Sequence, residues 1–290
     1  MPTTPVERTG WPTARGIIGL DRPNLVGILN ITPDSFYDGG RLERPAAAVA
    51  HADRLLEEGA DILDIGGEST RPGASRVTAD EERRRVIPII EAIVRRWPDV
   101  PLSVDTVKSE VAQTALDAGA AIINDVSGLR LDPRLGEVVA AAGAGIILMH
   151  SRGNVEQMAS YDLADYDAEP VAAIVAELAG ALDRARAAGI GEDAIVLDPG
   201  FGFAKRTEHS VAVLARLDRI VALGRPVLVG PSRKRFVGEL TGGLPAAERL
   251  EGTIAACVVA ALAGARLFRV HDVTPVRRAL AVAQAVREAR

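Results

Sequence analysis

Residues 24–40 read NLVGILNITPDSFYDGG, a short apolar run that passes directly into a polar loop. The run at 25–29 ends at Asn30, the loop ITPDSF follows, and the pair Gly39-Gly40 comes after it. A short, continuous apolar run bounded by turn residues is typical of a strand buried on both faces. We therefore expect a fully buried strand whose carboxyl end opens into a long loop.

The same pattern, an apolar run followed by a helical stretch, recurs along the whole chain. Eight such runs lie at residues 25–29, 62–65, 102–104, 121–123, 145–149, 194–197, 227–229 and 266–270. Helical periodicity is visible between them at 46–58, 80–96, 108–118, 171–188 and 210–223. Strands that alternate with helices imply parallel pairing through crossover connections. Eight such units match a (β/α)₈ barrel, which typically has ~250 residues.

The main alternative architecture is a doubly wound open sheet. That fold usually has fewer strands and often carries a glycine-rich fingerprint after its first strand, and this chain shows neither. We predict an α/β protein, a (β/α)₈ TIM barrel that forms a single domain over residues 1–290 with its core at about 24–285. Residues 10–22 are predicted to form a short hairpin or strap that closes the bottom of the barrel, and residues 1–9 are expected to be flexible.

The composition excludes several classes of protein. The net charge is 34 − 39 = −5, whereas a nucleic-acid-binding protein usually shows a concentrated basic excess. Cys257 is the only cysteine, so an internal disulfide or a cysteine-based zinc site is impossible and a reducing compartment is expected. No secretory signal is visible, and the most apolar run, 254–265, is shorter than the ~20 residues that span a bilayer. We expect a cytoplasmic protein that binds neither nucleic acid nor membrane.

Polar side chains end nearly every predicted strand. In strand order they are Asn30, Asp64, Asp105, Asn124 with Asp125, His150, Asp198, Ser232-Arg233-Lys234, and Arg269 with His271. Active sites of these barrels lie at the carboxyl ends of the strands. Because buried polar groups are costly unless they are paired, such a ring predicts an active site. The roles of Asp64, Asp125 and His150 stay open, since each could be a helix cap, part of a buried ion pair or a structural residue.

Four of these residues form a group suited to a heterocycle. Asp105, Asn124, Asp198 and Lys234 bring two carboxylates, an amide and an ammonium to one end of the barrel. A 2-amino-4-oxopyrimidine ring offers a donor edge to a carboxylate and a carbonyl oxygen to a lysine. Charge-assisted hydrogen bonds of this kind are the strong ones.

A second group is suited to an anion. The segment GGESTRPG at 66–73 places Thr70 and Arg71 on a glycine-flanked loop, and Arg269 and His271 lie two residues apart, which puts them on one side of a strand. Arginine binds phosphate oxygens bidentately, and the last loops of this fold commonly bind phosphate. No nucleophile–base pair stands out. We therefore expect non-covalent catalysis, in which these residues and a Mg²⁺ near Asn30 hold a departing diphosphate and carboxylates stabilise the cation left behind.

The segments together resemble the dihydropteroate synthase family, whose members join a pterin to p-aminobenzoate in folate synthesis. The matching motifs, in order from residue 24 to residue 272, are NITPDSF, GGESTRPG, SVDT, NDVSG, LMH, DPGFGF, SRKRF and RVHD. The resemblance implies that (7,8-dihydropterin-6-yl)methyl diphosphate and 4-aminobenzoate give 7,8-dihydropteroate and diphosphate. It also suggests a homodimer.

The resemblance implies a role for each matched residue. Asn30 would ligate Mg²⁺. The residues implied to hold the pterin are Thr70, Asp105, Asn124, Asp198 and Lys234, with apolar contacts from Ile147, Met149 and Phe203. Those implied to hold the diphosphate are Arg71, Arg269 and His271. Those implied to contact 4-aminobenzoate are Phe36, Thr70, Pro72 and Arg235, the last of which stands where many family members have a serine. The catalytic set is then Arg71, Asp105, Lys234, Arg269 and His271.

Other functions on the same barrel stay open. A methyltransferase-type protein that acts on a methylated folate with a corrinoid partner would keep the pterin carboxylates but would need neither STRPG nor Arg269 and His271. A non-catalytic pterin-binding or partner-binding paralogue would also keep the barrel. A Schiff-base aldolase that uses Lys234 is a more distant alternative.

Overall fold

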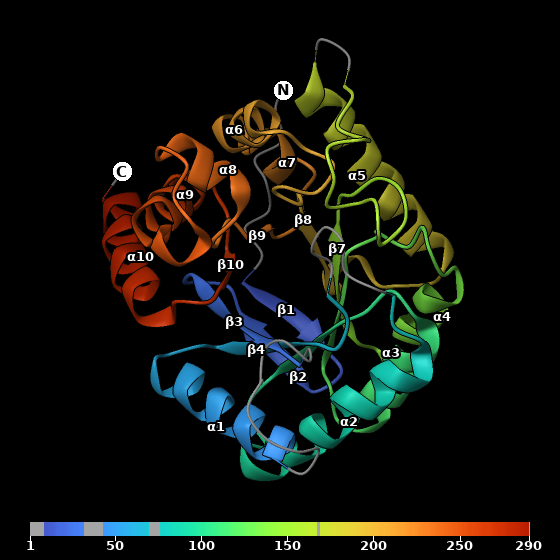
Figure 1. Ribbon diagram of the computed structural model, residues 1–290. Coiled ribbons are helices and arrows are strands. Elements are labelled where there is room, and N and C mark those ends of the chain that lie inside the picture. The colour runs from blue at the N-terminus through green and yellow to red at the C-terminus, as the bar shows by residue number, and fades with distance from the viewer. Residues whose placement is uncertain (1–8, 32–42, 70–75, 167–168, 290) are drawn as a thin grey trace.

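The computed structural model describes residues 9–31, 43–69, 76–166 and 169–289. Its central element is a ring of parallel strands with helices around the outside (Figure 1). The strand order is β8-β7-β6-β5-β4-β3-β10-β9, and the parallel bridge between Leu197 and Val227 joins the two ends of that series. The predicted (β/α)₈ barrel is therefore confirmed.

Every predicted apolar run overlaps a strand of the barrel. The bounds are β3 Asn24–Asn30, β4 Ile62–Gly66, β5 Leu102–Asp105, β6 Ile122–Asp125, β7 Gly145–Met149, β8 Ile195–Asp198, β9 Leu228–Val229 and β10 Leu267–Val270. Most residues in these strands are buried, because one face of each strand lines the barrel interior and the other packs against helices. Ala194 lies outside β8, in a 3₁₀ turn, Glu192–Ala194.

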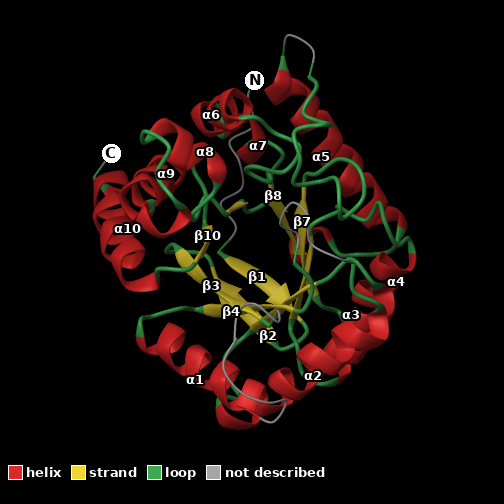
Figure 2. Cartoon of the chain, viewed as in Figure 1, coloured by secondary structure: helices red, strands yellow, loops and turns green. Residues whose placement is uncertain are grey.

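The helices surround the barrel (Figure 2). Their bounds are α1 Glu43–Glu57, α2 Ala79–Arg96, α3 Ser109–Asp117, α4 Arg134–Ala142, α5 Pro170–Ala187, α6 Thr207–Ala215, α7 Asp218–Val221, α8 Arg235–Leu240, α9 Leu250–Leu262 and α10 Val273–Glu288, with a 3₁₀ turn at Ala246–Glu248. The stretch of helical periodicity at 210–223 is divided between two helices, α6 and α7. Among these residues no helix is long and apolar enough to cross a membrane.

The predicted hairpin closes the amino-terminal end of the barrel. Strands β1, Gly10–Thr13, and β2, Gly16–Gly19, pair antiparallel. Trp11 is 0% exposed, packs against inward-facing residues of the barrel such as Val26 and Val196, and donates from Nε1 to the carbonyl oxygen of Ala194 at 2.8 Å. A Cβ at Gly145 would lie 3.1 Å from the Trp11 ring, so a side chain there would require the ring to shift by a few tenths of an ångström.

The strand register brings polar residues together at the opposite end. Asn30 pairs with Gly66, Gly66 with Asp105, and Asp105 with Asn124. Residues paired in this way on adjacent strands point to the same face of a sheet. Their side chains therefore share the carboxyl-terminal end of the barrel interior, where the sequence predicts the site.

Candidate active site

The site has an ion-paired centre built by Arg269. Its Nε donates to Oδ2 of Asp64 at 2.6 Å, and its Nη2 donates to Oδ2 of Asp105 at 3.2 Å. Nδ2 of Asn124 also donates to Oδ2 of Asp64, at 3.2 Å. Burial alone would lower the pKa of Arg269, but the carboxylates of Asp64 and Asp105 outweigh it and raise that pKa. Asp64, whose role the sequence left open, is a fully buried residue of this site.

Two carboxyl groups of the site have pKa values near neutrality. Burial raises the pKa of Asp105 to about 7, against the opposing effect of Arg269, and the negative charge of Asp64 adds to the rise. Burial raises the pKa of Asp198 to about 6, although the backbone N–H of Gly200 donates to its Oδ1 at 2.7 Å. Small changes in their surroundings therefore decide whether these groups are charged.

Lys234 lies over an aromatic ring at the edge of the site. Its Nζ is 3.9 Å from the centroid of the Phe203 ring, and its charge lowers the pKa of Asp198, which places ammonium, ring and carboxylate in one neighbourhood. Phe203 and Met149 belong to one buried cluster that also contains Val126. The structure thus brings together the lysine, the carboxylate and two of the three predicted apolar contacts.

Ile147, the third predicted apolar contact, lies two residues before Met149 on β7, and its partner in the strand register is Asn124. It packs in the cluster around Trp11 below Met149 and Phe203, so its contact with the pterin stays a prediction. Val126 is an apolar residue beside Met149 and Phe203 that was not predicted. The sequence offered a signal for Val126, because it follows Asn124 by two residues in NDVSG.

His271 is held by Ser232. The Ser232 hydroxyl accepts from the backbone N–H of His271 at 3.2 Å and lies 3.0 Å from Nδ1. Burial, with the nearby positive charge of Arg269, lowers the pKa of His271 to about 3, so the imidazole is neutral. In the tautomer in which Ser232 donates to Nδ1, the ring hydrogen is on Nε2, which can then donate to an anion. The ring is therefore uncharged in this structure, and the predicted contact of His271 with the diphosphate stays a prediction.

Arg233 and Asp272, to which the sequence alone assigned no role, hold this part of the site in place. Arg233 donates to Asp272 through Nη2 at 2.7 Å and Nε at 3.1 Å, which ties the loop after β9 to the end of β10. Arg233 has φ 59°, an uncommon left-handed conformation for a non-glycine residue. The signal for this pair was available, since both residues lie within the motifs SRKRF and RVHD.

The remaining predicted residues fall into two groups. Arg235 is exposed, with its guanidinium 3.8 Å from the Tyr161 ring centroid and its Nη2 3.4 Å from the carbonyl oxygen of Ala159, so it contacts a neighbouring loop and its role toward 4-aminobenzoate stays a prediction. The predicted residues that lie outside the described part of the chain are Phe36, Thr70, Arg71 and Pro72.

Asp125 and His150 have structural contacts. Asp125 accepts from the backbone N–H groups of Ser127 at 2.8 Å and Leu129 at 2.5 Å, which stabilises the turn after β6. His150 lies between Lys205, 2.6 Å from its Nδ1, and Glu177, 3.1 Å from its Nε2. Both therefore support the loops around the site.

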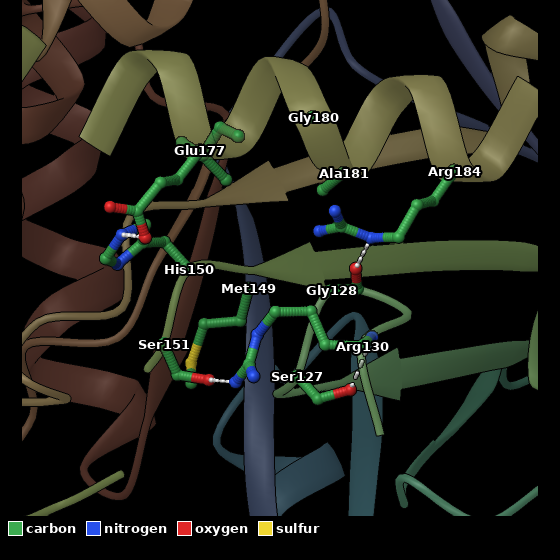
Figure 3. Close-up of a pocket in the computed structure, with 11 residues that line it drawn as sticks. Ser127, Gly128, Arg130, Met149, His150, Ser151, Glu177, Gly180, Ala181 and Arg184 are labelled. Atoms are coloured by element: carbon green, nitrogen blue, oxygen red, sulfur yellow. Dashed lines mark hydrogen bonds and ion pairs between the residues drawn. The ribbon is translucent and has the colours of Figure 1, made fainter. Parts of the chain in front are cut away.

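A cavity of about 130 Å³ lies between α5 and the segments that follow β6 and β7 (Figure 3). Its polar side chains largely bond to nearby backbone: Ser151 donates to the carbonyl oxygen of Val126 at 2.6 Å, and Arg184 donates to that of Gly128 at 2.9 Å. It shares Met149 and His150 with the surroundings of the site, but Asp105, Asp198 and Lys234 do not line it. We therefore place the candidate active site inside the barrel mouth and not in this cavity.

Comparison with known proteins gives a consistent result. A family model for pterin binding enzymes matches residues 26–271. The dihydropteroate synthase of Escherichia coli K12 is 43% identical over 276 residues, 94% of this chain and 95% of that protein. The dihydropteroate synthase of Synechocystis is 44% identical over 265 residues, 91% of this chain and 90% of that protein.

Solved structures show the same similarity. Dihydropteroate synthase from Xanthomonas albilineans with 4-aminobenzoic acid is 48% identical, has a TM-score of 0.88, and the match covers 96% of this chain and 98% of that one. A structure of the enzyme from the same organism in complex with 7,8-dihydropteroate is 46% identical with a TM-score of 0.82, over 93% of this chain and 95% of that one.

Proposed function

The chain belongs to the pterin-binding enzyme family, and from that premise we infer that it is a dihydropteroate synthase. It condenses (7,8-dihydropterin-6-yl)methyl diphosphate with 4-aminobenzoate to give 7,8-dihydropteroate and diphosphate. The observation that carries this function is that the family match at 26–271 spans the barrel strands whose ends supply the ion-paired centre, Asp198 and Lys234. We propose further that the chain acts as one domain.

We propose that the pterin binds against Asp198, Asn124 and Lys234. One oxygen of Asp198 already accepts from Gly200, so the other can accept from the amino edge of the ring. Nδ2 of Asn124 is used by Asp64, which leaves its Oδ1 to accept from a ring N–H. Lys234 would donate to the ring carbonyl, and Phe203, Met149 and Val126 would supply apolar contact.

We propose that Arg269 and His271 hold the diphosphate. Nε and Nη2 of Arg269 are engaged by Asp64 and Asp105, which fixes the guanidinium and leaves Nη1 for an anion. His271 would donate from Nε2, and Arg71 would add a second guanidinium. Fixed donors of this kind favour a step in which charge develops on the leaving group.

In that step the bond between the pterin methylene carbon and a diphosphate oxygen breaks, and the electron pair leaves with the diphosphate. The nitrogen lone pair of 4-aminobenzoate forms the new C–N bond, and the ammonium so formed loses a proton to solvent. The carboxylate of Asp105 would stabilise the cationic methylpterin between these events.

We propose that Asn30 contributes to a Mg²⁺ site. Within the described residues no group of three or more acidic, histidine or cysteine side chains could hold a metal by itself. Mg²⁺ is commonly held by one or two protein oxygens together with substrate phosphates, and Asn30 suits that role. Asn30 is partly exposed at the carboxyl end of β3, and its partner in the strand register is Gly66, which has no side chain. When bound, the metal would neutralise charge on the diphosphate.

We also propose that the protein is a cytoplasmic homodimer. Val282 and Val286 lie four residues apart on α10 and are 66% and 46% exposed, and Val259 on α9, which packs against α10, is 47% exposed. Exposed apolar side chains close together mark association surfaces. Light scattering of the parent protein and of a Val282→Asp variant tests this proposal. We expect the parent to be a dimer and the variant to be a monomer.

The decisive experiment for the reaction uses the purified protein, the pterin diphosphate, labelled 4-aminobenzoate and Mg²⁺. We expect labelled 7,8-dihydropteroate, and no product when the pterin diphosphate is left out. Binding of the pterin without any product would identify a non-catalytic paralogue. Consumption of a methylated folate with a corrinoid acceptor would identify the methyltransferase alternative.

A further inference from the structure

Lys205 is a buried lysine that neither the predicted site nor the proposed reaction uses. It follows Phe203 by two residues in DPGFGFAK, and it is 1% exposed. We propose that Lys205 is a positioning residue of the pterin site, which holds Asp198 and the ring of Phe203 in their binding positions. The proposal rests on the proposed function and extends it to a residue that contacts no substrate.

All three hydrogens of the Lys205 ammonium have acceptors. Nζ donates to the carbonyl oxygens of Gly200 at 3.2 Å and Phe203 at 3.0 Å, and it lies 2.6 Å from Nδ1 of His150. Among the described residues Lys205 forms no ion pair with a carboxylate. A buried ammonium is costly unless its hydrogen bonds are satisfied, so these three bonds account for its location.

The bond to Gly200 acts on Asp198. The same glycine accepts from Lys205 through its carbonyl oxygen and donates through its N–H to Oδ1 of Asp198. Gly200 has φ 67°, and a Cβ there would lie 2.1 Å from the carbonyl oxygen of His150, so no other residue fits this turn. Lys205 therefore holds one end of the peptide segment whose other end orients the carboxylate.

The bond to Phe203 acts on Lys234. The carbonyl oxygen of Phe203 accepts from Lys205, while its ring packs with Met149 and lies under Nζ of Lys234. The turn also has two backbone hydrogen bonds, from the N–H of Phe203 to Gly200 at 3.1 Å and from the N–H of Ala204 to Met158 at 2.7 Å. The Lys205 ammonium is the side chain that joins its two carbonyl oxygens, those of Gly200 and Phe203. One ammonium thus supports groups on both sides of the proposed pterin position.

His150 anchors this ammonium to the barrel. Because Nδ1 accepts from Lys205, Nε2 carries the ring hydrogen and donates to Oε2 of Glu177 on α5, as Figure 3 shows. Glu177 is held in turn by Arg152. The backbone N–H of His150 donates to the carbonyl oxygen of Asp198 at 2.8 Å. The position of Lys205 is therefore set by the carboxyl ends of β7 and β8 and by helix α5.

The test compares Lys205→Met with Lys205→Gln, which keeps two N–H donors. Calorimetry with a diphosphate-free pterin and steady-state kinetics provide the measurements. Misplacing a binding group by about 1 Å can cost about 100-fold, so we expect Lys205→Met to weaken pterin binding by about 10- to 100-fold. Lys205→Gln should weaken pterin binding by a smaller factor. The KM for 4-aminobenzoate at saturating pterin diphosphate should change by less than about threefold, because the loss lies in pterin binding.

Trp11→Phe is the matched control for a general loss of stability. It removes one buried hydrogen bond, to Ala194, at the opposite end of the barrel. We expect it to lower the thermal midpoint without changing pterin affinity. His150→Gln alters a single partner of the ammonium and carries the test if neither Lys205 variant folds; we expect weaker pterin binding there too.

A purely structural role would give a different result. If the folded Lys205 variants lost stability but kept the pterin affinity of the parent, or if pterin and 4-aminobenzoate KM rose together, the proposal would be wrong. Absence of dihydropteroate formation by the parent protein is a separate outcome, because it would reject the proposed reaction and leave the pterin-binding measurements interpretable.

Discussion

Replacing Asp198 by asparagine tests the proposed pterin site with little change of shape. In the parent protein Oδ1 of Asp198 accepts from the N–H of Gly200 at 2.7 Å. The asparagine oxygen can keep that bond, which forces its NH₂ group into the position of Oδ2. A donor then faces the amino edge of the pterin, which also donates.

The expected loss of pterin affinity can be estimated from the hydrogen bond that the substitution removes and the unpaired donor that it introduces. A hydrogen bond to a charged group contributes about 1.5–3 kcal/mol, and an unpaired buried donor adds a cost of about 1–3 kcal/mol. We expect pterin binding to weaken by ~2–4 kcal/mol. At ~1.4 kcal/mol per tenfold change, that is about 30- to 1000-fold in Kd.

The pH dependence gives a second, independent measurement. The pKa of Asp198 is raised to about 6 by burial, against the charges of Lys234, Lys205 and Arg269. Protonation would place a hydrogen on the oxygen that faces the amino edge of the pterin, so affinity should be highest above pH 6 and should fall as the pH is lowered through about 6. The asparagine variant should lack this fall. Two other groups have a pKa of about 7, Asp105 and Lys205, so a change near pH 7 that remains in the variant does not come from Asp198.

Calorimetry with a diphosphate-free pterin between pH 5 and 8 is the assay. Asp61→Asn is the control, because Asp61 is a partly buried carboxylate that accepts from the backbone of Leu25 at the amino end of β3. It should leave pterin affinity unchanged. An Asp198→Asn variant that binds within a factor of two of the parent, with the same pH profile, would refute the assignment.

Three further predictions concern the centre of the site and its ligands. Arg269→Ala should slow turnover by about 100-fold or more because it removes a donor to the leaving group, and it should lower the free energy of unfolding by ~3 kcal/mol because it leaves the Asp64 carboxylate buried without its cation. A denaturant titration that shows unchanged stability would contradict the ion-pair argument, and adding Asp64→Ala should recover part of the loss. Lys234→Arg should fail to bind the pterin since a planar fork cannot replace a compact ammonium, and a borohydride-stable substrate adduct on Lys234 would support aldolase chemistry instead. 4-Aminobenzoate should bind weakly alone and well with pterin and diphosphate present, as calorimetry can measure, and equal affinities would reject this order of binding.

The sequence predicts the barrel well because its strands are short, apolar at nearly every position and separated by helical periodicity. It also predicts that the site lies at the carboxyl-terminal end of the barrel, since polar residues follow the apolar runs there. It did not predict the break between α6 and α7, because the stretch 210–223 keeps an apolar periodicity across the junction. The local sequence pattern therefore predicts which segments are helical or extended. It does not predict where tertiary packing divides a helical segment into two helices.

The chemical state of the site depends on contacts between distant residues. Arg269 and Asp64 lie 205 positions apart, and their pairing cannot be read from either motif. The spacing of Arg269 and His271 places them on one side of the strand, yet burial and a neighbouring cation make the imidazole neutral. Alternation along β7 puts Ile147 and Met149 on the same face, but the depth of each along the barrel axis is set by strand register.

The ring of strands has one weak junction, between β8 and β9. Strand β9 has only two residues, and the single bridge between Leu197 and Val227 joins it to β8. Few backbone hydrogen bonds must break there, so this seam is where the barrel opens at the lowest free energy. Asp198 directly follows Leu197, and its backbone therefore has access to solvent whenever the seam parts. Amide hydrogen exchange should thus be fastest, among the strands, beside the carboxylate that reads the pterin, and bound pterin should slow it.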